Sequence, residues 1–166
     1  MKLRSEQGFS LIEVLVAVLV LTIGLLGLFG MQLAGVKSNQ SAYFRTQASL
    51  LASDMADRLR FNSDRAIAGG YDGFSTANSN VEKPSCWNTS TGCNETSLVD
   101  LDKAEWTESV EGGDDTAILL PNASGTIVRG AGNLFTVQIQ WDETTWDEDN
   151  ARKDVVRQTY AINLSL

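Results

Sequence analysis

The first third of the chain divides into a wholly apolar half and an amphipathic half. From Val14 to Val36 no residue is charged, and a helix of about 20 apolar residues is long enough to cross the hydrocarbon core of a bilayer. From Ser38 to Arg60 there is neither proline nor glycine, and apolar residues recur three or four positions apart, at Phe44, Ala48, Leu51, Met55 and Leu59. This pattern predicts one long helix from Phe9 to about Phe61, apolar all round at first and one-sided afterwards.

The last third of the chain alternates with a period of two. In 134–141 the apolar residues are Phe135, Val137, Ile139 and Trp141, and in 154–166 they are Val156, Tyr160, Ile162, Leu164 and Leu166. A further short strand is expected at 126–128. Alternation with one polar face is typical of an antiparallel sheet covered on one side. We expect the amphipathic half of the long helix to cover a sheet of three or four strands, which is an α+β fold.

The middle of the chain carries weaker signals. Residues 62–95 are rich in Asn, Ser, Thr and Gly and predict an irregular connector. Residues 97–110 predict a short helix capped by Ser97. Its apolar side would consist of Leu98, Leu101 and Trp106.

A charged leader precedes the apolar run, and a single carboxylate stands at the entrance of that run. Residues 1–8 include Lys2 and Arg4, and Glu13 follows shortly afterwards. An acidic residue deep in a membrane costs roughly 3 kcal/mol, which argues for a partner that neutralises it. A secretory signal would have an apolar core of about 7 to 15 residues followed by a small-residue cleavage site. Here the core is longer and no Ala-x-Ala site follows it.

These residues resemble a known family. The stretch 8–17, GFSLIEVLVA, is similar to the type IV prepilin signature. The stretch 23–28 (IGLLGL) with Gln32 resembles more narrowly the PilV minor pilins, as do 45–48 (RTQA) and 54–60 (DMADRLR). The resemblance implies a prepilin leader at 1–8, a long helix at 9–61 whose first half is transmembrane or in the filament core, and a pilin head at 62–166.

The resemblance also implies a specific maturation. A prepilin peptidase would cut after Gly8 and methylate the new amino terminus on Phe9. Glycine suits such a cut because it has no Cβ to obstruct a tight protease site. An ammonium and a carboxylate are costly apart in a water-poor filament core. We therefore expect Glu13 of one subunit to pair with the Phe9 terminus of its neighbour.

The function implied is that of a minor pilin subunit of a type IV pilus, which contributes to pilus initiation, to the tip complex and thereby to cell adhesion. Implied partners are other minor pilins, the major pilin, the prepilin peptidase and a PilY-type tip protein. The protein would sit in the inner membrane as a single-pass subunit with its head in the periplasm, and later in the extracellular pilus. The alternative is a minor pseudopilin of a type II secretion system, which shares the leader and the helix.

The composition of the chain bears on which ligands, activities and cysteine chemistry are expected. The net charge of −8 disfavours nucleic-acid binding, which depends on clustered Lys and Arg. We find no nucleophile–base pair, phosphate loop or metal cluster, so we expect no cofactor and no enzyme. In an exported chain the close pair Cys86 and Cys93 favours a disulfide over free thiols. Zinc would need four ligands, and the chain has no histidine and only these two cysteines.

Two questions stay open at this level. Gly24, Gly27, Gly30 and Gly35 either allow close helix packing or mark a segment that melts on filament assembly. The acidic stretch 142–150 is either a solvated hairpin loop or a calcium site.

Overall fold

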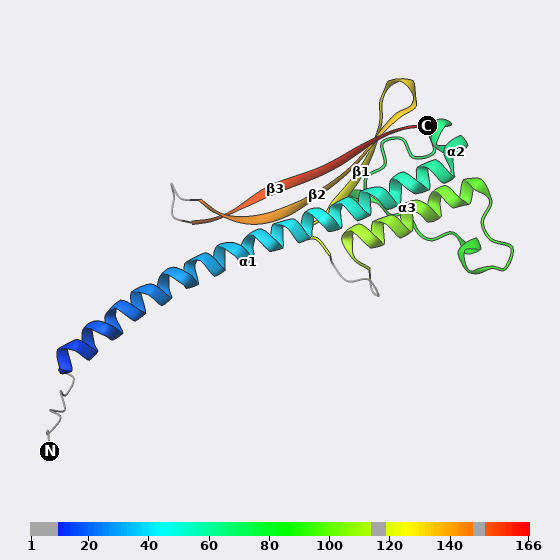
Figure 1. Cartoon of the computed structure of the whole chain (residues 1–166). Helices are drawn as coiled ribbons and strands as arrows, with labels where there is room; N and C mark the ends of the chain where they lie inside the picture. Colours follow the sequence, from blue (N-terminus) through cyan, green and yellow to red (C-terminus); the bar gives the residue numbers. More distant parts are fainter. Residues whose placement is uncertain (1–9, 114–118, 148–151) are drawn as a thin grey trace, which may run out of the picture. The chain divides into compact units, whose positions relative to one another are not determined.

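The computed structural model describes residues 10–113, 119–147 and 152–166 (Figure 1). The chain forms two compact units, which meet between Ser41 and Ala42. Helix α1 (Leu11–Phe61) contributes residues to both units.

The first unit consists, in its described part, of the apolar portion of α1. Every residue from Ser10 to Gln40 is exposed. The helix is long and apolar enough to cross a membrane, and none of that portion is buried. Soluble proteins rarely expose a continuous apolar surface of this kind, so this surface requires a cover of lipid or protein.

The second unit contains a three-stranded antiparallel sheet in the order β1-β2-β3. Strand β1 is Ser124–Arg129, β2 is Leu134–Asp147 and β3 is Arg152–Ser165. The predicted alternation is confirmed on β2, where the buried residues are Phe135, Val137, Ile139 and Trp141. Opposite them on β3, Leu164 is buried, and Tyr160 and Ile162 are partly buried against the core. The predicted α+β pilin-like fold is thus observed.

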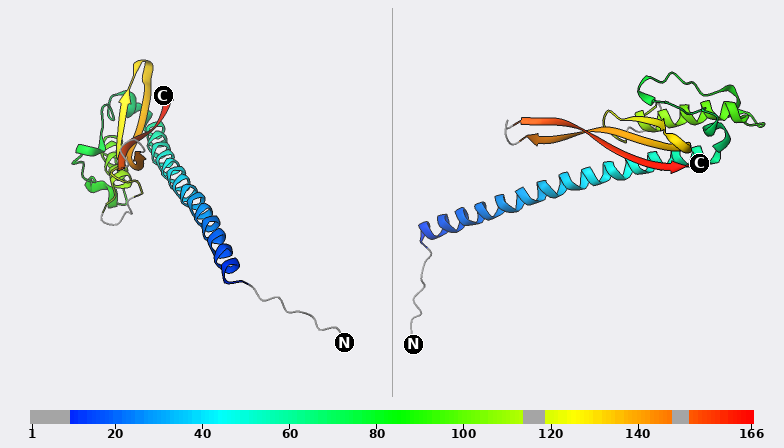
Figure 2. Two further views of the ribbon diagram at one scale, coloured as in Figure 1. Left: turned by 90° about the vertical axis from the view of Figure 1, so that its left-hand side faces the viewer. Right: turned by 90° about the horizontal axis from the view of Figure 1, so that it is seen from above.

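The amphipathic part of α1 supplies the helical side of the core. Its buried residues are Ala48, Leu51, Ala52, Met55, Ala56 and Leu59, so the predicted face is confirmed, with Phe44 at its partly buried margin. Helix α3 (Glu95–Glu111) runs alongside this part of α1 (Figures 1 and 2). The indole Nε1 of the fully buried Trp106 donates a hydrogen bond of 2.9 Å to the carbonyl of Leu51 and joins the two helices.

Helix α3 differs from its prediction in start and phase. It begins at Glu95, and its cap is Asn94, whose side chain accepts a hydrogen bond of 2.8 Å from the backbone N–H of Ser97. Its buried residues are Val99, Asp102, Ala104, Trp106 and Val110, whereas Leu98 and Leu101 are only half-buried. The phase differs because Asp102 lies on the core side, where partners from other elements bury its carboxylate.

The predicted connector contains more helix than expected. It includes α2 (Ser63–Ile67) and the 3₁₀ turns η1 (Thr76–Asn78) and η2 (Ser85–Asn88). A third 3₁₀ turn, η3 (Ala131–Asn133), joins β1 to β2. The segment before η1 protects the outer edge of β1, because the N–H of Ile127 donates to the carbonyl of Phe74 at 2.9 Å.

The prediction that the acidic stretch 142–150 is a loop from its first residue is wrong. Strand β2 continues through it as far as Asp147, and its register with β3 is unbroken, with Asp142 opposite Arg157 and Glu143 opposite Val156. The pairing of β1 with β2 ends at Gln140. Val156, predicted on the covered face, is 40% exposed because it lies on this extension of the hairpin beyond β1.

Gly125 in β1 is required by close packing against Trp106. A Cβ at this position would lie 2.5 Å from Cη2 of the indole. We expect Gly125→Ala to lower the free energy of unfolding by about 1–3 kcal/mol, because it overpacks a rigid aromatic contact. Denaturant unfolding of the full-length protein in detergent measures this change. Gly130→Ala is the matched control, since a Cβ there meets only ordinary contacts from 3.5 Å outward, and an equal loss in both variants would contradict the steric explanation.

Candidate assembly site

Glu13 lies in the first turn of α1, on a helix surface that is otherwise apolar. It is exposed and shares one side of the helix with Val14, Ala17, Val18 and Leu21. In the described part of the first unit the only basic residue is Lys37. At 1.5 Å per residue, Lys37 is about 36 Å further along the helix. Within that described part Glu13 therefore has no cation in reach, and its predicted pairing requires another chain or the amino terminus.

The predicted processing residues fall outside the described part of the chain. Gly8 and Phe9 precede Ser10, where the described structure begins. Cleavage after Gly8 and methylation on Phe9 therefore stay predictions.

The four glycines of the apolar run lie within continuous helix, and a Cβ at any of them would meet nothing within 4 Å. Whether this segment packs closely or melts in a filament stays open.

A buried polar cluster joins the second half of α1 to α3. Arg58 donates to Asp102 at 3.1 Å and to Glu105 at 2.8 Å, and it also pairs with Asp54 one turn earlier on α1. Burial works to lower the pKa of Arg58, but the hydrogen bond to Glu105 and the charges and hydrogen bonds of Asp54 and Asp102 outweigh it and raise the pKa. The guanidinium therefore stays charged and fixes the α1–α3 contact.

Tyr71 completes this cluster from the connector. Its hydroxyl donates to Asp102 at 2.5 Å and accepts from the amide of Asn62 at 3.1 Å. Burial raises the pKa of Tyr71, and the hydrogen bond to the negative Asp102 raises it further. This cluster was not predicted from the sequence. The spacing of Val99, Asp102 and Trp106 was its one available signal, because it places an acid on the apolar side of α3.

The structure contains the predicted disulfide between Cys86 and Cys93, with an S–S distance of 2.08 Å. It closes the loop that includes η2 and leads to Asn94, the cap of α3. No free cysteine remains. The bridge thus holds the approach to α3 in place.

Removing the disulfide is expected to destabilise the second unit moderately. For a loop this short, restriction of the unfolded chain predicts a loss of about 2 kcal/mol in the Cys86→Ser/Cys93→Ser variant. Denaturant unfolding under oxidising conditions measures it. The wild type under reducing conditions is the control and should lose the same amount, whereas an unchanged midpoint in both would contradict a stabilising role.

The first residues of the acidic stretch are engaged within the protein. Asp142 accepts from Asn122 at 2.8 Å and pairs with Arg157 at 3.0 Å. These two contacts lower the pKa of Asp142. Among the described residues no group of three acidic or sulfur ligands is placed to hold a metal ion. Because 148–151 lie outside them, the calcium hypothesis for 142–150 stays untested.

The fold defines a class of protein: a long N-terminal helix with an apolar first half, together with a small α+β head that contains an antiparallel sheet, as in type IV pilins. Residues 3–29 match the prokaryotic N-terminal methylation motif, and residues 30–104 match the family of type IV pilin Tt1218. The motif, the family match and the fold together support a type IV pilin. Such pilins are structural subunits and not enzymes. No curated protein and no solved structure gives a significant match to the chain.

Proposed function

We propose that the protein is a minor pilin of the PilV kind, which helps to initiate a type IV pilus and to build its tip complex. The observation that carries the proposal is the exposed apolar surface of α1, which overlaps the match to the methylation motif at 3–29 and contains the single carboxylate Glu13. Lipid covers such a surface before assembly, and the helices of neighbouring subunits cover it in a filament. The carboxylate then meets the processed amino terminus of a neighbour.

The proposed processing and assembly of the subunit follow from this apolar surface. The prepilin peptidase cleaves after Gly8 and methylates Phe9, while α1 holds the subunit in the inner membrane with its head in the periplasm. The subunit then joins other minor pilins, the major pilin and a PilY-type tip protein in the extracellular pilus. The purified protein should begin at a methylated Phe9, and mass spectrometry of its N-terminal peptide tests this. An intact Met1 in cells that make fibres would contradict the proposal.

A minor pseudopilin of a type II secretion system is the second candidate, since the same motif and helix serve both assemblies. Deletion of the gene separates the two. Loss of surface pili with normal protein secretion supports the minor pilin, and loss of secretion with normal pili supports the pseudopilin. Complementation with the wild-type gene is the control that assigns the defect to this chain.

A further inference from the structure

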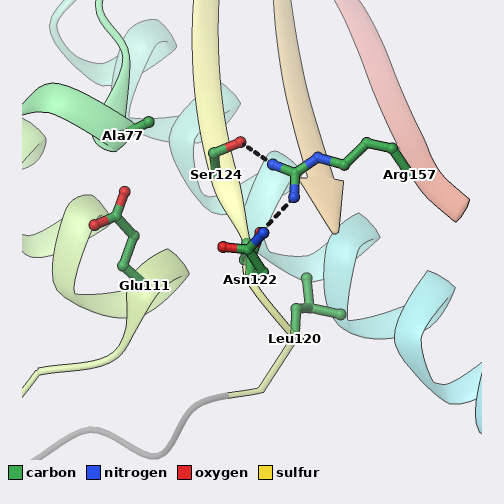
Figure 3. A pocket seen from close by; sticks show the side chains of 7 residues that line it. Ala77, Glu111, Leu120, Asn122, Ser124 and Arg157 are labelled. Carbon is green, nitrogen blue, oxygen red and sulfur yellow. Dashed lines mark hydrogen bonds between the residues drawn. The ribbon is translucent and has the colours of Figure 1, made fainter. Parts of the chain in front are cut away.

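A pocket of about 390 Å³ lies in the second unit, between the C-terminal end of α3 and the start of β1 (Figure 3). Glu111 stands on one side, with Ala77 near it. Asn122 and Ser124 stand on the other side, where Arg157 reaches in from β3. The pilin features described above assign no role to this pocket.

One carboxylate oxygen of Glu111 lacks a hydrogen-bond partner among the described residues. Its Oε1 is buried, and among the described residues it is the one buried side-chain oxygen or nitrogen without a hydrogen-bond partner. Glu111 is also the last residue of α3, and the last turn of this helix contains no basic residue. The C-terminal end of a helix carries partial negative charge, which disfavours a carboxylate and attracts a cation. Two independent features therefore make Glu111 an acceptor that lacks a positive donor.

Arg157 does not fill that role. One of its guanidinium nitrogens, Nη1, donates to the carbonyl of Asn122 at 2.6 Å and to Asp142 at 3.0 Å. The other, Nη2, donates to the hydroxyl of Ser124 at 2.7 Å. Asp142 balances the charge of Arg157 on that wall, so the charge of Glu111 remains to be neutralised.

We propose that this pocket binds an organic cation, a primary ammonium or a guanidinium, with Glu111 as its charged acceptor. The hydroxyl of Ser124 and the side-chain carbonyl of Asn122 are further polar groups of the lining. The apolar lining residues Ala77 and Ala123 are not fully buried, and they suit an alkyl stem such as that of lysine, which buries its methylenes and presents its charge at the tip. The same chemistry is offered by a free alkylamine and by a basic side chain of another protein.

Titration of the full-length protein in detergent with n-butylammonium and butylguanidinium tests the proposal. Backbone amide shifts of Gly112 and Ser124 in two-dimensional NMR report occupancy. We expect saturable shifts with both cations and none with butyrate or butanol. Glu111→Gln should weaken binding about tenfold or more, since hydrogen bonds to charged groups contribute about 1.5–3 kcal/mol. Glu82→Gln, which removes the same charge from an exposed site outside the pocket, should leave binding unchanged.

The result that overturns the proposal is the absence of saturable binding, or equal binding by wild type and Glu111→Gln; the pocket then holds solvent only. If Glu111→Gln perturbs the fold, as its amide spectrum reveals, Glu111→Asp takes its place, because it keeps the charge but shortens the reach. Carbodiimide treatment of intact cells identifies the source of a bound amine. An amide between Glu111 and a lysine of another chain indicates a protein partner, and binding of butylammonium without such a crosslink indicates a free amine. Neither arm depends on the role of the protein in pili.

Discussion

Glu13→Gln is expected to reduce incorporation of the protein into pili by about 100-fold or more. The substitution keeps the shape of the side chain but removes the charge that we propose pairs with the amino terminus of a neighbouring subunit. Breaking a buried ion pair by removing one partner costs about 3–5 kcal/mol, which corresponds to a factor of more than 100 in an equilibrium constant. The amount of this subunit in sheared and purified fibres, relative to its amount in the membrane, measures the effect.

Asp57→Asn is the matched control for this experiment. It also replaces a carboxylate by an amide, but at an exposed position on α1 where Asp57 pairs, among the described residues, only with Arg60 at 2.7 Å. Exposed pairs of this kind contribute little to stability, so we expect normal incorporation. Normal incorporation of Glu13→Gln as well would remove the proposed role of Glu13. A defect in both variants would indicate instead a general sensitivity of assembly to subunit charge.

Asp102→Ala is expected to lower the free energy of unfolding of the head by about 3–5 kcal/mol. Asp102 accepts from Tyr71 and from Arg58, and its removal leaves a buried hydroxyl without its acceptor and a partly buried guanidinium with fewer partners. Denaturant unfolding of the full-length protein in detergent measures the loss. Asp100→Ala on the same helix is the control, because Asp100 is exposed and an exposed substitution changes stability by about 0.5 kcal/mol or less.

The dependence of stability on pH gives an independent measure of the same cluster. The pKa of Tyr71 is raised in the folded protein, so the neutral phenol favours folding. That contribution is fully present below the ordinary tyrosine pKa of about 10 and is lost as the pH rises through the higher folded value. We expect wild-type stability to fall above this pH and the fall to be smaller in Tyr71→Phe. Identical alkaline profiles for the two proteins would show that the Tyr71–Asp102 hydrogen bond does not control this titration.

The sequence by itself determined the elements whose signals are local. The charge-free run, the three- and four-residue spacing from Phe44 to Leu59 and the alternation from Phe135 to Trp141 arise from the periods of the helix and the strand. Each period can be counted along a few neighbouring residues without knowledge of the rest of the chain. The two cysteines were also paired correctly, because they are close in sequence and no third cysteine competes.

Only the tertiary structure decided which polar residues are buried and what satisfies them. Asp102 lies on the core side of α3 because Tyr71 and Arg58, separated from it by 31 and 44 positions, converge on its carboxylate. Glu111 of α3 and Arg157 of β3 line one pocket because the fold brings these two elements, distant in sequence, near each other. The cost of burying a polar group depends on its partners in space, and a periodic pattern along the chain contains no information about partners that distant. Local periodicity therefore predicted the long helix and the sheet, and long-range contacts determined the phase of α3, the extent of β2 and the polar interior of the head.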